Sequence, residues 1–322
     1  MAIPKIVVIT GPTGTGKTAL SVMLAKELGG EIVSADSMQV YRRMDIGTAK
    51  VTPEETCGVA HHMIDTAEPT ESFSVAAYVE AARGCIDDIL ARGKLPFVVG
   101  GTNLYIDSLI ADIDFADNDG DGALREKLNA EYDAVGGEAM LERLRGFDPE
   151  RAEKLHAADK KRIVRAIEVY ELTGRTMTEH DAETQKKPPR YDAAVIALDF
   201  EDRADLYARI DSRVDGMERA GLFDEVKSLL DSGLSENSTA MQAIGYKEPA
   251  AYFRGEISRE EALEQIKRES RRYAKRQLTW LRRNKDVFWI RWGKSPDFNK
   301  ARLLSTEFLK SRGYDVDTHN GR

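Results

Sequence analysis

The first hundred residues alternate between short apolar runs and longer amphipathic segments. Lys5–Ile9, Glu31–Ala35 and Leu95–Val99 are short, mainly apolar runs, which predicts strands that are buried on both faces. Between them, residues 17–28 and 74–90 carry apolar side chains at helical spacing. Strands that alternate with helices predict a parallel sheet with helices on both of its faces.

The strand pattern then stops and returns only near residue 193. Asp112–Gly122 is acidic and contains glycine, as a linker would, and Ala123–Thr184 has a helical pattern with no clear strand. Ala193–Leu198 predicts a further strand, the rest is helical in pattern, and the tail after Gly293 is marginal. A strand that resumes after a helical stretch indicates an inserted all-helical domain. We expect boundaries at 1–114, 115–189 and 190–322.

Length and composition exclude several classes of protein. The chain has 322 residues, 42% hydrophobic and 32% charged, which is enough for two domains or for one core with a large insertion. The apolar run Ile6–Ile9 is far shorter than the roughly 18 residues of a membrane span. Residues 1–5 lead straight into a predicted strand, so we expect no signal peptide. Two cysteines predict neither a disulfide framework nor a zinc site, which favours a cytoplasmic protein.

Charge is unevenly distributed along the chain. The net charge is −8, which alone would disfavour a nucleic-acid partner. Residues 267–285, however, hold nine basic side chains against one acidic one. A second basic group lies at Lys160, Lys161, Arg162 and Arg165. Because a polyanion responds to the local field, the composition permits RNA binding without requiring it.

One motif is specific for phosphate. Between the first predicted strand and helix, the chain fits G-x-x-x-x-G-K-[ST]. Glycines let consecutive N–H groups point at an anion, and the following helix adds its positive end. The lysine supplies a point charge, and the final hydroxyl can hold Mg²⁺. The motif consists of Gly11, Pro12, Thr13, Gly14, Thr15, Gly16, Lys17 and Thr18. It predicts a P-loop NTPase-like α/β fold with the helical insertion and a helical C-terminal region.

The phosphate loop does not by itself define the reaction. An ordinary P-loop ATPase needs a carboxylate at a strand end to hold Mg²⁺. Asp36 ends the second predicted strand, and Asp199 ends the fourth. We interpret Asp199 as a strand-end or capping residue rather than a metal ligand.

Around Asp36 the sequence becomes distinctive. The blocks are Ser34–Tyr41, Met44–Lys50, His61–Asp65, Val99–Tyr105, Arg162–Gly174, Ala243–Glu248 and Ala274–Arg282. In kind and order they resemble tRNA dimethylallyltransferases, also called tRNA isopentenyltransferases, over roughly residues 5–290. The absence of further cysteines fits the bacterial type. One departure is the stretch 114–122, which lacks the proline usual where the insertion begins.

The resemblance implies prenyl transfer. The amine of the adenosine just 3′ of the anticodon would attack dimethylallyl diphosphate, and diphosphate would leave. By match to the family motifs, Asp36 would be the base or orienting group, Thr102 would help to hold the amine, and Arg213 would bind the diphosphate with Lys17. The cofactor would be Mg²⁺, held through Thr18. Arg209, four residues before Arg213, we interpret as a surface arginine.

The resemblance also implies an RNA interface. The anticodon stem-loop would be bound by a protein that we expect to be a monomer with no membrane contact. The implied contacts are Asp36, Ser37, Met38, Gln39 and Thr102 near the target base; Arg125, Lys160, Lys161, Arg162, Ile163, Val164 and Arg165 in the insertion; and Arg272, Lys275, Arg276 and Gln277 in the C-terminal basic segment.

Two other functions remain open from the sequence. Prenyl transfer to free AMP, ADP or ATP, as in cytokinin synthesis, would use the same loop and Asp36. It would have less need of a helical insertion and a basic helix. A nucleotide kinase or nucleotide-gated RNA-binding module would use the loop for ATP, but it would leave Asp36 without a clear purpose.

Overall fold

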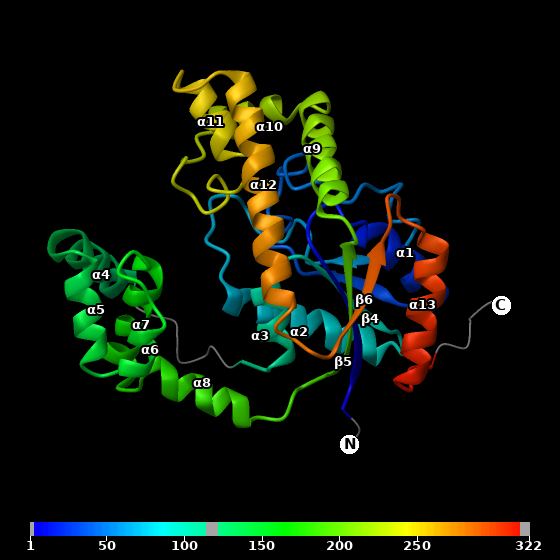
Figure 1. Ribbon diagram of the computed structural model, residues 1–322, viewed down its shortest axis with the longest axis horizontal. Coiled ribbons are helices and arrows are strands. Elements are labelled where there is room, and N and C mark those ends of the chain that lie inside the picture. The colour runs from blue at the N-terminus through cyan, green and yellow to red at the C-terminus, as the bar shows by residue number, and fades with distance from the viewer. Residues whose placement is uncertain (1–2, 114–121, 316–322) are drawn as a thin grey trace. The chain divides into compact units, whose positions relative to one another are not determined.

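Among the described residues, six strands form one entirely parallel sheet. The computed structural model describes residues 3–113 and 122–315 (Figure 1). The strand order is β3-β2-β4-β1-β5-β6. The strands are β1 (Lys5–Thr10), β2 (Glu31–Ser34), β3 (His61–His62), β4 (Pro96–Gly100), β5 (Asp192–Phe200) and β6 (Val287–Trp292). The parallel sheet expected from the alternating pattern is confirmed.

The chain divides into two compact units, Met1–Leu109 with Tyr191–Arg322, and Ile110–Arg190. The sheet unit carries α1 (Lys17–Glu27), α2 (Val75–Ala91), α3 (Asn103–Ile110), α9 (Arg203–Arg219), α10 (Leu222–Asp231), α11 (Lys247–Phe253), α12 (Arg259–Leu281) and α13 (Phe298–Ser311). In the described residues of the second unit, every regular element is a helix. Its helices are α4 (Gly122–Val135), α5 (Gly137–Arg145), α6 (Pro149–Glu153), α7 (Lys160–Thr173) and α8 (Met177–Lys186). Most of the expected linker, residues 114–121, lies outside the described residues.

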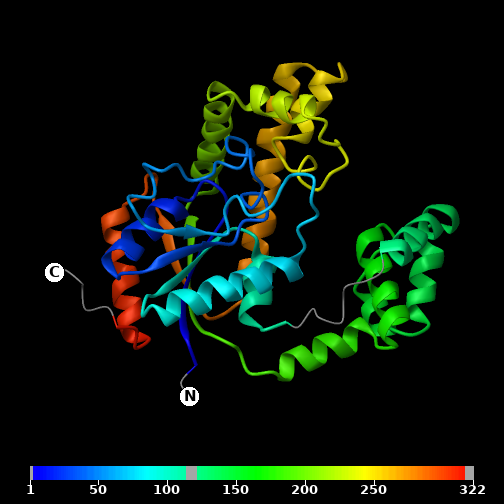
Figure 2. The same ribbon diagram turned by 180° about the vertical axis from the view of Figure 1, so that it is seen from behind.

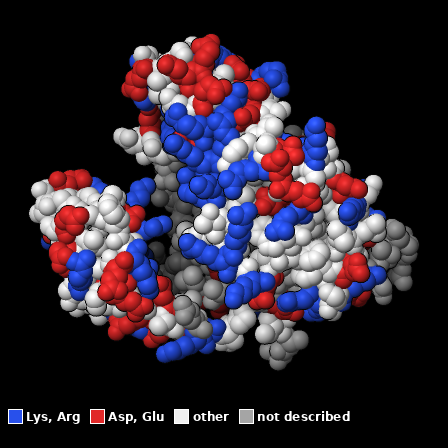
Figure 3. Space-filling view, viewed as in Figure 1, with Lys and Arg blue, Asp and Glu red and all other residues white. Residues whose placement is uncertain are grey.

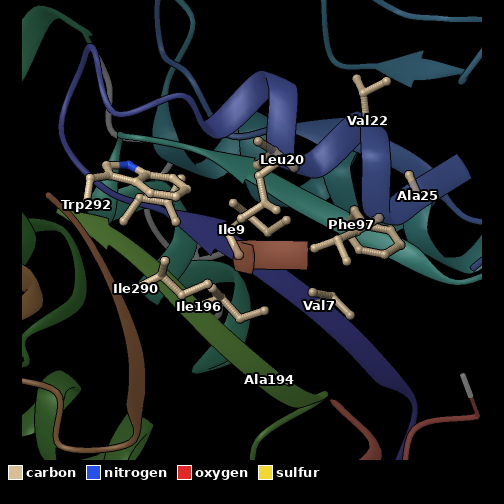
Figure 4. Packing of buried hydrophobic residues seen from close by; sticks show 14 of the residues in the cluster. Val7, Ile9, Leu20, Val22, Ala25, Phe97, Ala194, Ile196, Ile290 and Trp292 are labelled. Carbon is tan, nitrogen blue, oxygen red and sulfur yellow. The ribbon is translucent and has the colours of Figure 1, made fainter. Parts of the chain in front are cut away.

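The core of the sheet unit explains why the strands are so apolar. Ile9 of β1 and Ile196 of β5 belong to one fully buried cluster with Leu20 of α1 (Figure 4). Ile6 and Val8 alternate with this set along β1 and are also fully buried, so both faces of the strand are covered. Each such side chain stabilises the fold by about 1.5–3 kcal/mol through its burial.

The C-terminal tail is more ordered than its pattern predicts. The sequence gives little sign of β6, an edge strand with only two buried residues, or of α13. The helix begins after Asp297, whose carboxylate accepts the Lys300 N–H at 3.0 Å. Beyond it, the Tyr314 hydroxyl accepts the Ala194 N–H at 3.0 Å, which ties the tail to β5. The expectation of a marginal tail is therefore wrong, because its order comes from contacts with distant strands.

The length and apolar character of the helices show whether any of them could cross a membrane. None of the helices in the described part of the chain is long and apolar enough to cross a membrane.

Candidate active site

Three loops meet at one edge of the sheet because β1, β2 and β4 are parallel neighbours. At Gly100 an added Cβ would lie 2.1 Å from the Ala35 carbonyl oxygen, which shows how tightly two of these loops pack. A cavity of about 490 Å³ opens at this edge. Helices α9 and α12, which lie side by side (Figure 2), contribute to its wall. Such a position, at the carboxyl ends of parallel strands, is where α/β folds bind ligands.

The phosphate loop needs its glycines for two physical reasons. Gly11 has φ +138°, and a Cβ there would lie 2.4 Å from the Leu198 carbonyl oxygen. Gly16 has φ +84°, and a Cβ there would lie 2.8 Å from the Phe298 ring. Gly16 is also the N-cap of α1 and offers no side-chain cap. The first N–H groups of α1 are therefore available to an anion.

Side chains from distant elements hold the loop from outside. The Trp292 indole N–H donates to the Thr15 carbonyl at 2.8 Å. The Gln277 side chain accepts the Thr13 N–H at 3.3 Å and donates to the Gly101 carbonyl at 2.8 Å. Gln277 was expected to contact RNA. Since both ends of its amide already bind the protein, its evident role is to join the phosphate loop to the end of β4.

Arg209 also holds the phosphate loop in place. Its Nε donates to the Gly14 carbonyl at 3.0 Å, and its guanidinium lies 5.7 Å from the centre of the Phe200 ring. Arg209 is exposed, as expected of a surface arginine, but its contact with the Gly14 carbonyl was not expected. The helical spacing from Arg213 was visible in the sequence, but the carbonyl that it meets was not.

Two cations line the cavity beside the loop. Lys17 Nζ donates to the Gly11 carbonyl at 3.0 Å and the Pro12 carbonyl at 2.8 Å. Burial, and then repulsion from Arg213, lowers the pKa of Lys17 to about 8. Burial likewise lowers the pKa of Arg213, and its buried Nε has no hydrogen-bond partner among the described residues. Two neighbouring cations whose charged forms are disfavoured by burial would be stabilised by a bound anion, so they form an anion site.

Asp36 lines the same cavity. Its Oδ1 accepts the N–H of Met38 at 2.9 Å and of Gln39 at 3.3 Å. The Asp36 charge raises the pKa of both Lys17 and Arg213, against the larger effect of their burial. The carboxylate therefore faces the anion site, and among the described residues both of its hydrogen bonds use one oxygen. The other oxygen keeps its lone pairs for a ligand.

Thr102 fixes the loop that follows Asp36. Its hydroxyl oxygen accepts the Ser37 N–H at 3.0 Å and lies 3.3 Å from the Ser37 hydroxyl. Tyr273 of α12 lines the same cavity as Asp36. Burial, and then the charge of Asp36, raises the pKa of Tyr273 to about 12. Tyr273 was not among the expected site residues, because an aromatic residue in a basic helix is more often core.

Apolar side chains also line the cavity, among them Val51, Ile64, Ile210, Val214, Met217, Ile244 and Ile266. A short hydrocarbon group can therefore lie beside the anion site without losing contact with apolar surface. Asp199 is not part of this lining. It is buried, its Oδ1 accepts the Phe200 N–H at 2.9 Å, and its Oδ2 lies 3.6 Å from Arg282.

Comparisons with known proteins decide the family. A family model described as IPP transferase matches residues 39–284. A tRNA dimethylallyltransferase of Thermoanaerobacter sp. is 48% identical over 307 residues, which are 95% of this chain and 96% of that protein. The chain belongs to the tRNA dimethylallyltransferase family. A second member, from Bacillus licheniformis, is 52% identical over 287 residues, 89% of this chain and 90% of the relative.

Solved structures of the family share the fold. The tRNA isopentenylpyrophosphate transferase of Bacillus halodurans superposes with a TM-score of 0.71 at 42% identity, covering 96% of this chain and 98% of that one. A eukaryotic dimethylallyltransferase, described as acting on tRNA, gives a TM-score of 0.82 at 27% identity. That match covers 99% of this chain and 82% of the other. The parallel-sheet architecture is thus that of the dimethylallyltransferase family.

The residues that the family resemblance assigns to RNA fall into two groups on α12. Arg272, Lys275 and Arg276 are exposed, and Figure 3 shows Lys and Arg side chains gathered along this helix. Arg276 also lines the cavity. Gln277 lies beneath them and is buried.

In the helical unit the same assignment needs correction. Lys161 and Arg162 are exposed, and Lys160 pairs with Asp133 at 2.6 Å. Ile163 and Val164 are core residues of this unit, so their side chains are not available to RNA. Apolar residues at helical spacing are buried for packing, and the resemblance to a motif could not separate them from their basic neighbours.

Arg125 and Arg165 have a structural partner. Both bind Glu168, Arg125 at 3.0 Å and Arg165 at 2.7 Å, and Glu168 is fully buried. A buried carboxylate needs such cations. Their first role is therefore to neutralise Glu168, whatever further contact they make.

Proposed function

We propose that the protein transfers a dimethylallyl group from dimethylallyl diphosphate to the N6 amine of the adenosine 3′-adjacent to the anticodon of tRNA. One observation carries the proposal: Asp36 and the cation pair Lys17 and Arg213 line one cavity. A group that orients an amine and a site that binds a diphosphate therefore serve the same space. The family membership supports the same reaction.

The phosphate loop would hold the leaving group. Its N–H groups and the start of α1 would bind the diphosphate, while Lys17 and Arg213 would neutralise the charge that grows as the C–O bond breaks. Stabilisation that increases toward the transition state is what accelerates a step. The apolar wall beside this site would hold the five-carbon chain.

The donor atoms at the site suit Mg²⁺. Thr18 supplies a hydroxyl and Asp36 a carboxylate to the lining of the cavity, and Mg²⁺ prefers oxygen ligands from few protein groups together with phosphate. Thr18 would hold the ion. When bound, Mg²⁺ would add positive charge beside the diphosphate oxygens.

The acceptor side would be Asp36 and Thr102. The exocyclic nitrogen would attack C1 of the dimethylallyl group, so that an N–C bond forms as the C–O bond breaks and diphosphate leaves. Asp36 would hydrogen-bond the amine and take its proton. The adenine has to leave its stack to reach the cavity, at a cost of a few kcal/mol.

Contacts with phosphates would offset that cost. Such contacts hold RNA in register without reading its sequence, and the exposed cations of α12 suit this task. In the helical unit, Lys160, Lys161 and Arg162 would do the same. We further propose that the protein is a monomer and works on tRNA in the cytoplasm.

The test is a transfer assay with radiolabelled dimethylallyl diphosphate and Mg²⁺. Unmodified tRNA with an adenosine 3′ of the anticodon and free AMP are offered in parallel. We expect label in tRNA only. Asp36→Asn should lower kcat by on the order of 10²–10⁴, as expected for loss of a general base, with tRNA affinity nearly unchanged. Asp286→Asn, at an exposed carboxylate outside the cavity lining, is the control.

The other outcomes assign the protein elsewhere. Label in AMP would mean an adenylate prenyltransferase and would leave the basic helix unexplained. No label in either acceptor, with ATP consumed instead, would mean an ordinary nucleotide site. Equal loss in Asp36→Asn and the control would remove Asp36 from the mechanism.

A further inference from the structure

An acidic residue outside the quoted sequence blocks makes four hydrogen bonds near the site. Glu225 lies on α10, and one of its oxygens accepts the N–H of Asp45 at 2.8 Å and of Ile46 at 2.7 Å. The other oxygen accepts the N–H of Gly47 at 3.1 Å and the Tyr246 hydroxyl at 2.6 Å. One carboxylate thus joins α10, the loop at 45–47 and the residue that precedes α11.

The loop that Glu225 holds is a hydrogen-bonded turn. The Ala49 N–H donates to the Ile46 carbonyl and the Lys50 N–H to the Asp45 carbonyl, both at 2.9 Å. The first N–H groups of such a turn have no partner within it. A carboxylate is a strong acceptor for them, so Glu225 caps this turn from a different helix.

Packing fixes the turn in the same place. A Cβ at Gly47 would lie 2.4 Å from the Tyr246 ring, so only glycine lets the turn approach this ring. Tyr246 is fully buried, and burial followed by the charge of Glu225 raises the pKa of its phenol. The phenol therefore stays protonated and donates to Glu225.

The far end of the turn leads to the proposed base. The Gln39 side-chain amide donates to the carbonyls of Thr48 and Ala49, both at 3.3 Å. The Gln39 main-chain N–H in turn donates to Asp36 Oδ1. Gly47, Thr48 and Ala49 also line the cavity. If the turn moved, both the Asp36 carboxylate and the cavity wall would move with it.

We propose that Glu225 is a positioning residue for the acceptor side of the reaction: through the turn at 45–49 and Gln39 it sets the place of Asp36. The inference rests on the proposed function. The diphosphate side has its own supports: Gln277, Trp292 and Arg209 make their hydrogen bonds to Thr13, Thr15 and Gly14 of the phosphate loop. Loss of Glu225 therefore affects the amine-orienting half of the cavity and spares the phosphate loop.

The experiment compares Glu225→Gln with Asp224→Asn, the adjacent and exposed carboxylate on the same helix. We expect Glu225→Gln to lower kcat for tRNA prenylation by roughly ten- to a hundredfold, since displacing reacting groups by about 1 Å costs on the order of a hundredfold. Affinity for inorganic diphosphate, measured by titration calorimetry, should stay within twofold. Asp224→Asn should match the wild type in both measurements.

Gly47→Ala disturbs the same cap from the loop, because the added Cβ would clash with the Tyr246 ring. It should lower kcat in the same way, and the double variant Glu225→Gln with Gly47→Ala should lose less than the product of the single effects. Full additivity would mean that the two residues act separately, and a Glu225→Gln kcat within twofold of wild type would overturn the proposal. A parallel loss of diphosphate affinity would reduce Glu225 to a general structural role.

Amide hydrogen exchange tests whether Glu225 caps the turn without relying on the catalytic rate. The amides of Asp45, Ile46 and Gly47 should exchange slowly in the wild type and in Asp224→Asn, and faster in Glu225→Gln. If the wild type failed to prenylate tRNA, the proposed function would fall while these amides still reported the cap. Unchanged exchange in Glu225→Gln would overturn the positioning role itself.

Discussion

The cations in the cavity and the cations on α12 differ in how they are held. Lys17 and Arg213 line the cavity, and burial lowers the pKa of each. Arg272 and Lys275 are exposed, and Arg272 pairs with Glu269 at 2.7 Å. The first pair pays a desolvation cost that a bound anion offsets. The second pair stays hydrated at little cost.

The cations in the cavity and the exposed cations on α12 are therefore suited to different tasks. A buried cation in fixed geometry acts strongly on one group of a ligand, because little water screens it. An exposed cation contributes to a field that any phosphate feels and that salt weakens. Loss of Lys17 or Arg213 from the cavity should therefore impair chemistry, and loss of an exposed cation on α12 should impair RNA affinity.

Among the cations, the largest effect is expected at Arg213. Arg213→Ala should lower kcat by about 10²–10³, the usual result of removing a donor to a developing negative charge, while the KM for tRNA changes little. Arg219→Ala, at an exposed arginine on the same helix, is the matched control. Steady-state kinetics with both substrates decides the point. Similar losses in the two variants would end the distinction between buried and exposed cations.

A smaller effect is expected from pH. The pKa of Lys17 is lowered to about 8, so its charge is present below pH 8 and is lost as the pH rises above it. We therefore expect kcat/KM for dimethylallyl diphosphate to fall above pH 8 by about tenfold per unit at most. In Lys17→Arg the rate should be lower but level to pH 10, because arginine stays protonated. A level wild-type profile to pH 10 would contradict this assignment.

The smallest effect is expected on the exposed helix face. Lys275→Ser should raise the KM for tRNA a few-fold and reduce the slope of log affinity against log salt by roughly 0.7–1. The kcat should not change. Lys310→Ser, at an exposed lysine on α13, should leave the slope as it is. Filter binding over a series of salt concentrations tests this, and a change in kcat without a change in slope would refute it.

Local patterns predicted much of the sheet unit. The strands at residues 5, 31, 95 and 193, and the helices between the first three, are found within a few residues of the expected bounds. Each is a continuous run whose burial follows from its own side chains. β6 and α13 were missed because their buried positions are few or small, such as Ala301 and Ser305. Contacts with β5 and α1 make them stable.

The residues of the site also fall into those that the sequence could predict and those that it could not. The phosphate loop could be read from the sequence because its glycines, its lysine and the start of α1 are neighbours in the chain, and their geometry is local. Asp36 and Arg213 could be named only through resemblance to a family. Gln277, Arg209 and Trp292 support the loop from positions nearly 200 or more residues away. Nothing in their own surroundings in the sequence shows which carbonyl or N–H each one meets.

By itself, the sequence determined most strands and helices of the sheet unit, the phosphate loop and the family, because these depend on neighbouring residues or on motifs in a fixed order. Only the tertiary structure decided which side chains support the loop, that Ile163 and Val164 are core, and that Glu225 caps a turn leading to Asp36. Those roles depend on where the chain returns in space. A hydrogen bond between residues 180 positions apart is set by the packing of the whole sheet unit.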